Sequence, residues 1–216
     1  MPTYEEIEES IKKLNNGRAP GEDNIIPEMI KYGGKKRAKK LHELTCAIWK
    51  EEKMPEDWET GIICTIFKKG DKFDCNNYRG IALLDTAYKV FSNILNERLK
   101  KITENLLEDY QCGFHKYRST SDQIFIIRQM IEKHYEHNQD LHMLFVDFKQ
   151  AFDSIDRYKL YQVMEDMKIP HKLIRLVKMT MKNTTARMKV TNKLSNSFTF
   201  NAVVRQGDGL LPPCSF

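Results

Sequence analysis

Segments with helical spacing and short strand-like runs follow one another irregularly along this chain, and their order limits the folds it can adopt. Helical spacing of apolar side chains predicts helices over residues 4–14, 41–50, 87–106, 119–131, 157–167 and 171–182. Apolar and β-branched runs predict strands over residues 61–67, 141–148, 186–190 and 197–203. No regular strand–helix–strand rhythm or internal repeat connects these segments, which favours an α+β fold over a doubly wound sheet.

The predicted elements are separated by residues that favour turns. Asn16-Gly17 ends the first helix, Met54-Pro55 breaks the chain after the second, and Lys69-Gly70-Asp71 follows the first strand. Residues 192–196 form a polar loop between the last two strands, which predicts a hairpin there. The longest helix, residues 87–106, carries one continuous apolar stripe and is expected to pack against the core.

Composition narrows the class of protein. Hydrophobic residues make up 41% of the 216 residues and charged residues 30%, which is typical of a folded globular chain. The longest apolar runs are far shorter than the roughly 18 residues of a membrane span, and the polar start at Met1–Glu6 lacks the features of a signal peptide. Five scattered cysteines without a CxxC pair argue against a disulfide framework or a zinc site. We therefore expect an intracellular protein, nuclear or cytoplasmic, that is neither secreted nor bound to a membrane.

Basic residues exceed acidic ones, and they gather in two stretches. The formal net charge is +5 at pH 7. Residues 31–40 contain six basic side chains and no acid, and a second group comprises Lys68, Lys69, Lys72 and Arg79. Both stretches are compatible with a polyanionic partner, and equally with an ordinary solvated surface.

One acidic residue stands at the end of a predicted strand. Asp147 follows the apolar run Leu144-Phe145-Val146. Burying a carboxylate there is costly unless a cation or a hydrogen-bond donor meets it, and a rigid strand end suits a Mg²⁺ ligand. From the residues alone a turn or capping role is the commoner one for an aspartate in the position of Asp147, and Asp156 is placed to cap the next helix.

Taken together, six motifs resemble the reverse transcriptase domain of non-LTR (LINE-type) retrotransposons, and they occur in that family's order. The stretches that carry the resemblance are residues 15–28, 58–71, 77–90, 111–122, 144–153 around Asp147, and 205–210, Arg-Gln-Gly-Asp-Gly-Leu. The resemblance implies a right-hand polymerase fold with an antiparallel palm sheet. It assigns residues 1–140 approximately to the fingers with connecting helices, and 141–216 approximately to a partial palm with interleaved fingers elements, without a thumb.

The resemblance also implies roles for single residues. Asp147 and the backbone carbonyl of Phe148 would be ligands of the catalytic Mg²⁺ ions. The incoming dNTP would be held by Lys69 and Arg79, and Lys68 is an alternative for the lysine role. The other partners would be an RNA template and a DNA primer. Further nucleotide contacts would come from Gln150, Ala151, Phe152 and Gln206. Phe152 would exclude a 2′-hydroxyl by bulk, and Gly207 would let the backbone approach the template base pair.

The chain departs from the family pattern after residue 210. No Asp-Asp pair occurs anywhere in the sequence, so the family's second carboxylate motif is absent from these residues. We therefore expect a fragment of an RNA-directed DNA polymerase that is inactive alone, with exposed apolar palm surface and no pairing neighbour for the Asp147 strand. A nucleic-acid-binding remnant without catalysis and an incomplete gene model are the alternatives.

Overall fold

The computed structural model describes residues 1–104, 106, 110–113, 118–148, 155–191, 193–199, 208 and 210. Helices in this part of the chain are α1 Tyr4–Lys12, α2 Pro27–Lys31, α3 Gly34–Glu51, α4 Thr86–Thr103, α5 Thr120–Glu136, α6 Arg157–Asp166 and α7 His171–Met181, with 3-10 turns at Glu56–Glu59 and Cys75–Asn77. Strands are β1 Thr60–Phe67, β2 Tyr78–Leu83, β3 Thr185–Val190, β4 Lys193–Leu194 and β5 Phe198–Thr199. The helices and strands mix as expected for an α+β chain, although α2 and β2 were not anticipated.

Local signals in the sequence explain where several helices begin. Thr3 accepts a hydrogen bond from the Glu6 amide while Glu6 accepts one from the Thr3 amide, so a capping box starts α1. Ser119 and Asp122 form the same arrangement at α5, and the Asp156 carboxylate caps α6 by accepting from the Lys159 amide. The predicted capping role of Asp156 is thereby confirmed.

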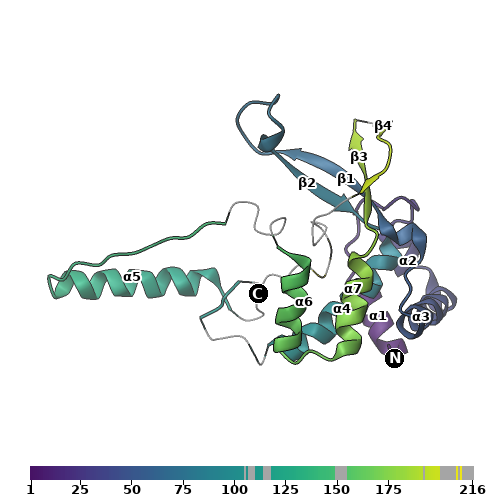
Figure 1. Ribbon diagram of the computed structural model, residues 1–216, viewed down its shortest axis with the longest axis horizontal. Coiled ribbons are helices and arrows are strands. Elements are labelled where there is room, and N and C mark those ends of the chain that lie inside the picture. The colour runs from purple at the N-terminus through teal and green to yellow at the C-terminus, as the bar shows by residue number, and fades with distance from the viewer. Residues whose placement is uncertain are drawn as a thin grey trace.

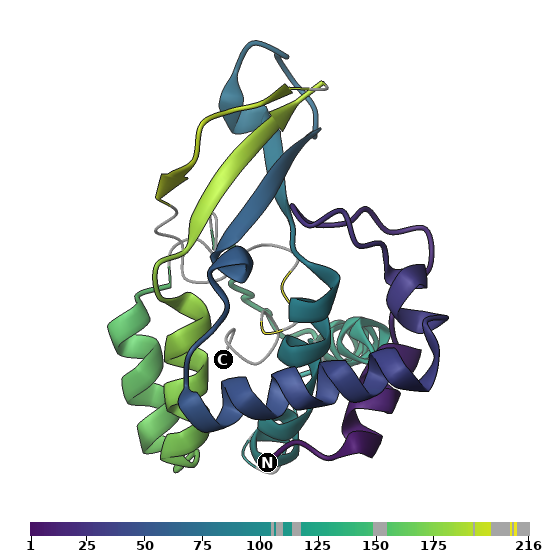
Figure 2. The ribbon, with the colours of Figure 1, turned by 90° about the vertical axis from the view of Figure 1, so that its right-hand side faces the viewer.

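The sheet is mixed and stands above the helices (Figure 1, Figure 2). Its strand order is β2-β1-β3-β4, and β5 also pairs with β3. β1 runs antiparallel to β2 and parallel to β3, with Ile63 opposite Ala82 on one side and Met188 on the other. The predicted hairpin near residues 186–203 is confirmed in its described part, because β3 pairs antiparallel with β5, although β4 lies within the expected loop.

Helix α4 joins the two apolar cores. One face places Tyr88, Phe91 and Leu95 in a cluster with the end of α3, Trp58, α6 and α7. The adjacent face places Val90 and Ile94 in a second cluster with α1, α2 and the first turns of α3. The apolar stripe predicted for residues 87–106 is therefore core, and it fixes the helical layer from which the sheet rises.

The segment 141–148 is not a strand, so that prediction is wrong. It contains no helix or strand, and Leu144 and Phe145 are 89% and 74% exposed. A strand needs a neighbour to pair its amides and carbonyls, and none of the described residues pairs with this segment. The apolar side chains of this segment are exposed, as expected.

Helix α5 extends away from the other helices (Figure 1). None of its described residues is buried, and Ile124 and Phe125 are 68% and 61% exposed. Together with segment 141–148, α5 presents an apolar arm to solvent. No described helix is both long enough and apolar enough to cross a membrane.

Candidate nucleotide and nucleic-acid interface

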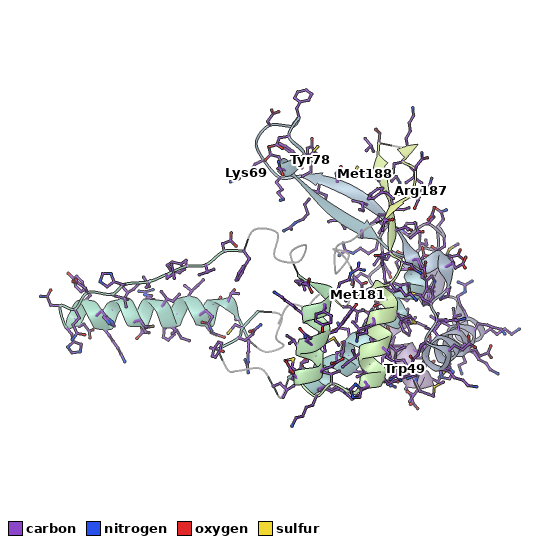
Figure 3. All side chains as sticks on the ribbon, in the orientation of Figure 1. Trp49, Lys69, Tyr78, Met181, Arg187 and Met188 are labelled. Carbon is purple, nitrogen blue, oxygen red and sulfur yellow. The ribbon has the colours of Figure 1, made fainter. Side chains whose placement is uncertain are left out.

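The β1–β2 hairpin brings the predicted phosphate-binding cations to one end. Ile66 lies opposite Arg79 and Phe67 opposite Tyr78, and the Lys68 amide extends the ladder by donating to the Asn77 carbonyl at 2.8 Å. Lys68, Lys69 and Arg79 are all exposed. Lys69 and Tyr78 both lie at the loop end of the hairpin (Figure 3). Within the described part of the chain, neither the Lys69 nor the Arg79 side chain forms a hydrogen bond or ion pair, so both cations are available to a ligand.

The loop that joins the two strands is held by its own hydrogen bonds. The Asn77 side-chain amide donates to the Asp71 carbonyl at 2.9 Å, and the Asp71 carboxylate accepts from the Phe73 amide at 2.9 Å. Gly70 has φ +96°, and an added Cβ would come within 2.8 Å of the Asn77 side chain. A residue other than glycine would therefore be strained here, and the loop keeps Lys69 beside a fixed turn.

Phe73 projects from this ordered loop and is 96% exposed. The neighbouring Phe67 and Tyr78 rings pack with centroids 5.4 Å apart, and the Lys72 ammonium lies 5.9 Å from the Phe67 ring. Aromatic faces among cations suit the stacking of single-stranded bases with phosphates nearby. The sequence analysis assigned no role to Phe73. An aromatic residue between Lys72 and Asp74 in a polar loop could have indicated an exposed ring beside a cation.

The described part of the last motif is anchored to α4. The Tyr88 hydroxyl donates to the Asp208 carboxylate at 2.5 Å, and Asp208 accepts from the Leu210 amide at 3.1 Å. Leu210 is buried in the larger core cluster. Gln206 and Gly207, to which nucleotide and template contacts were assigned, lie outside the described residues. The anchor at Asp208 holds the chain that follows them against the helical layer.

Asp147 and Phe148 lie at the exposed end of segment 141–148. In the described residues no hydrogen bond or ion pair joins Asp147 to the basic side chains of the hairpin. Gln150, Ala151 and Phe152 lie outside the described residues. The joint role of the first carboxylate motif and the hairpin cations therefore stays a prediction.

A magnesium site is not complete within the described residues. Throughout that part of the chain, no group of three or more His, Cys, Asp or Glu side chains is placed to hold a metal ion. Two Mg²⁺ ions need several carboxylates to fix their octahedral geometry and offset their charge. Asp147 with the Phe148 carbonyl does not satisfy that need alone.

The loop from the first motif packs against the junction between β2 and α4. The Asp85 carboxylate, only 2% exposed, accepts from the Asp23 amide at 3.3 Å. An added Cβ on Gly21 would lie 2.1 Å from that carboxylate, so only glycine allows this approach. Burial, and next the neighbouring Asp23 charge, raise the pKa of Asp85 to about 6. Sequence reasoning assigned no role to Asp85.

Two further contacts tie this loop to the rest of the molecule. The Thr86 hydroxyl donates to the Ile25 carbonyl at 2.5 Å, and Arg187 on β3 forms an ion pair with Glu22 at 2.5 Å. Burial lowers the pKa of the nearby Lys89 ammonium, with the acids Asp85 and Asp23 acting in the opposite direction. The loop thus links the start of α4 to the sheet that carries the hairpin.

Known proteins share this sequence pattern. Residues 66–213 match the family described as "Reverse transcriptase (RNA-dependent DNA polymerase)". The probable RNA-directed DNA polymerase from transposon BS of Drosophila melanogaster is 28% identical over 96% of this chain and 23% of its own length. The RNA-directed DNA polymerase from mobile element jockey of the same species is 26% identical over 97% of this chain and 23% of its own length.

A third relative extends the comparison beyond insects. The uncharacterized 149 kDa protein of transposon TX1 from Xenopus laevis is 22% identical over 95% of this chain and 16% of its own length. The chain therefore spans less than a quarter of the length of each of these three relatives. Since the family match covers more than half of the chain, this protein belongs to the reverse transcriptase family, alongside the polymerases of non-LTR retrotransposons.

Proposed function

We propose that this chain is the fingers and part of the palm of a retrotransposon RNA-directed DNA polymerase. Such an enzyme adds dNTPs to the 3′-hydroxyl of a DNA primer on an RNA template. Residues 1–140 approximately form the fingers with their connecting helices. Residues 141–216 approximately contribute a partial palm with interleaved fingers elements, and no residue is assigned to a thumb. An intracellular location, nuclear or cytoplasmic, suits this activity.

The observation that carries the proposal is the placement of Lys69 and Arg79 at the end of one ordered hairpin. The planar guanidinium of Arg79 can donate two parallel hydrogen bonds to phosphate oxygens, and Lys69 adds a compact charge from the loop. Lys68 is exposed at the same end and stays a rival for the lysine role. This hairpin would hold the triphosphate of the incoming dNTP.

The remaining roles follow from the family pattern. Phe152 would exclude a 2′-hydroxyl beside the sugar, while Gln150, Ala151 and Gln206 would contact the nucleotide and Gly207 the template base pair. Asp147 and the Phe148 carbonyl would supply ligands to Mg²⁺, which in this family offsets charge during phosphoryl transfer. Because the described residues do not complete that site, further carboxylates are required.

Binding without catalysis is the second candidate function. It is favoured by the exposed cationic hairpin, which can hold a polyanion without any catalytic step. Phe73 would stack on a base of single-stranded RNA in either case, with the neighbouring cations near the phosphates.

Two ligands and two variants test the assignment. Lys69→Ala with Arg79→Ala should weaken dATP binding about tenfold, as expected for lost charge-assisted hydrogen bonds, and RNA binding less. Phe73→Ala should weaken single-stranded RNA binding about fivefold and leave dATP binding unchanged. For each variant, calorimetry measures the affinity for dATP and fluorescence anisotropy measures the affinity for RNA.

Matched controls carry the same changes elsewhere on the surface. Lys12→Ala with Lys133→Ala removes two exposed cations, and Tyr135→Ala removes an aromatic side chain from α5 that is 87% exposed. Neither control should alter dATP binding. Equal losses for both ligands in the Lys69 and Arg79 variant would refute the triphosphate role.

A further inference from the structure

An open, cation-lined cavity of about 470 Å³ lies beside α6 and α7, and none of the residues assigned above lines it. Its charged lining comprises Glu52, Arg157, Arg175, Lys178 and Lys182. Four cations and one anion give this lining a formal charge of +3. Such an excess of one sign is favourable only for a ligand of the opposite sign.

The single acid of the lining is already engaged. Glu52 follows α3 with φ 54°, and its amide donates to the Ile48 carbonyl, which fixes its position. Its carboxylate accepts from Arg175 at 2.8 Å and from Lys172 at 2.6 Å. Hydrogen bonds from Arg175 and then Lys172 lower the pKa of Glu52 to about 2. Glu52 therefore stays ionised and is shared by Arg175 and Lys172, apart from the other three cations of the lining.

Those three cations come from facing ends of the α6–α7 pair. Arg157 begins α6 and donates to the Thr184 hydroxyl at 3.3 Å, just before β3. Lys182 follows α7 and is exposed. Lys178 is exposed as well, and its ammonium lies 3.6 Å from Glu165, a solvent-screened pair of little strength. Since Asp156 caps α6, the side chains rather than the helix end provide the positive charge.

One wall of the cavity is apolar and aromatic. The Tyr161 hydroxyl donates to the Met181 sulfur at 3.5 Å, and the Lys178 ammonium lies 4.8 Å from the centre of the Tyr161 ring. A cavity of this volume, with an aromatic wall and cations at its rim, is large enough for a nucleotide unit. Figure 3 places Met181 at the end of α7 nearest the sheet.

We propose that this cavity binds a backbone phosphate of a nucleic acid, with Arg157, Lys178 and Lys182 as its cations. The choice of a nucleic acid rests on the proposed function, whereas the phosphate chemistry rests on the lining. α6 begins at the residue after Asp156, close in sequence to the motif around Asp147. A strand held here would be gripped at a second point, remote from the hairpin loop.

The test removes the two exposed lysines. Lys178→Gln with Lys182→Gln should weaken binding of a labelled single-stranded RNA, measured by fluorescence anisotropy. The slope of log K against log salt should become shallower by about 0.7, since one neutralised phosphate of a single strand contributes about that much. The matched control, Lys12→Gln with Lys133→Gln, should keep the slope of the unaltered chain. dATP binding should be unchanged in both variants, because Lys69 and Arg79 remain.

A second experiment measures the extent of chemical acetylation of each lysine in the unaltered chain, with and without RNA. RNA should protect Lys178 and Lys182 more than Lys12 and Lys133, and more than inorganic phosphate does at the same phosphate concentration. Equal slopes for the two double variants, or equal protection by phosphate and RNA, would overturn the proposal. If one of these two results is found while the unaltered chain binds dATP, the proposed function still holds. If the unaltered chain does not bind dATP, the proposed function itself is contradicted.

Discussion

Asp85 occupies the position before α4 where an aspartate usually caps a helix, but its side chain makes no capping hydrogen bond. It turns instead to the Asp23 amide in the loop that contains Gly21. The carboxyl is buried beside another acid, so its ionised form is disfavoured in the folded chain. Asp85 therefore stabilises a contact between segments far apart in sequence instead of capping α4.

This arrangement predicts that stability depends on pH around Asp85. Because folding raises the pKa of Asp85 to about 6, the stabilisation from its neutral form is complete at low pH and is lost as pH rises through 6. Asp85→Asn keeps an acceptor for the Asp23 amide and cannot ionise. It should stabilise the chain by on the order of 1 kcal/mol at pH 7, with little gain at pH 4. Urea unfolding at pH 4 and at pH 7 measures the change in the free energy of unfolding. An equal change at the two pH values would contradict the prediction.

At the scale of elements, α4 and α5 have similar lengths but opposite surroundings. α4 contributes to both core clusters, whereas α5 buries none of its described residues. Each carries a phenylalanine near its first turns: Phe91 is 0% exposed and Phe125 61%. The stability of the described fold should therefore depend on α4 and hardly on α5.

The same substitution in the two helices tests this contrast. Phe91→Ala should lower the free energy of unfolding by about 3–5 kcal/mol, because it removes buried area and leaves a cavity. Phe125→Ala should change it by less than about 0.5 kcal/mol, as is usual for exposed positions. Thermal or urea unfolding gives both values. A large loss from Phe125→Ala would mean that α5 is packed in solution, against a second copy or another part of the chain.

At the scale of the whole molecule, the hairpin proposed to bind the nucleotide is paired in a sheet, whereas the segment that contains Asp147 is not. The hairpin is fixed by its ladder and loop, and Asp208 is fixed by Tyr88. The segment with Asp147 has no sheet partner in the described structure. Nucleotide binding and catalysis would therefore depend on different parts of this chain, the hairpin for binding and the segment with Asp147 for catalysis.

We expect the 216-residue chain to be inactive in primer extension with Mg²⁺ or Mn²⁺. The physical reason is the shortage of carboxylates to hold two metal ions, which no other described acid supplies. The exposed apolar arm should also make the isolated chain prone to association. Primer extension before and after Asp147→Ala checks this expectation. Robust extension that is lost in the variant would show that other residues complete the metal site.

Much of the secondary structure could be predicted because its cause is local. The sequence shows the apolar stripes of α4 and α7, the cap before α6 and the β-branched run of β1. β2 was not anticipated, since its glycine and arginine weaken the strand pattern and its stability comes from pairing with β1. The prediction for residues 141–148 failed for the same reason, because a strand also requires a partner.

The sequence by itself determined the family, the order of the motifs and the identity of the cations at the hairpin. Only the tertiary structure decided that Phe73 is presented to solvent, that Asp85 is buried against the loop at Gly21, and that Arg157, Lys178 and Lys182 surround one cavity. Helix periodicity and capping depend on residues within a few positions of each other. Burial and pKa depend on residues far apart in sequence, 62 positions for Asp23 and Asp85 and 123 for Glu52 and Arg175, and only the folded chain brings these together.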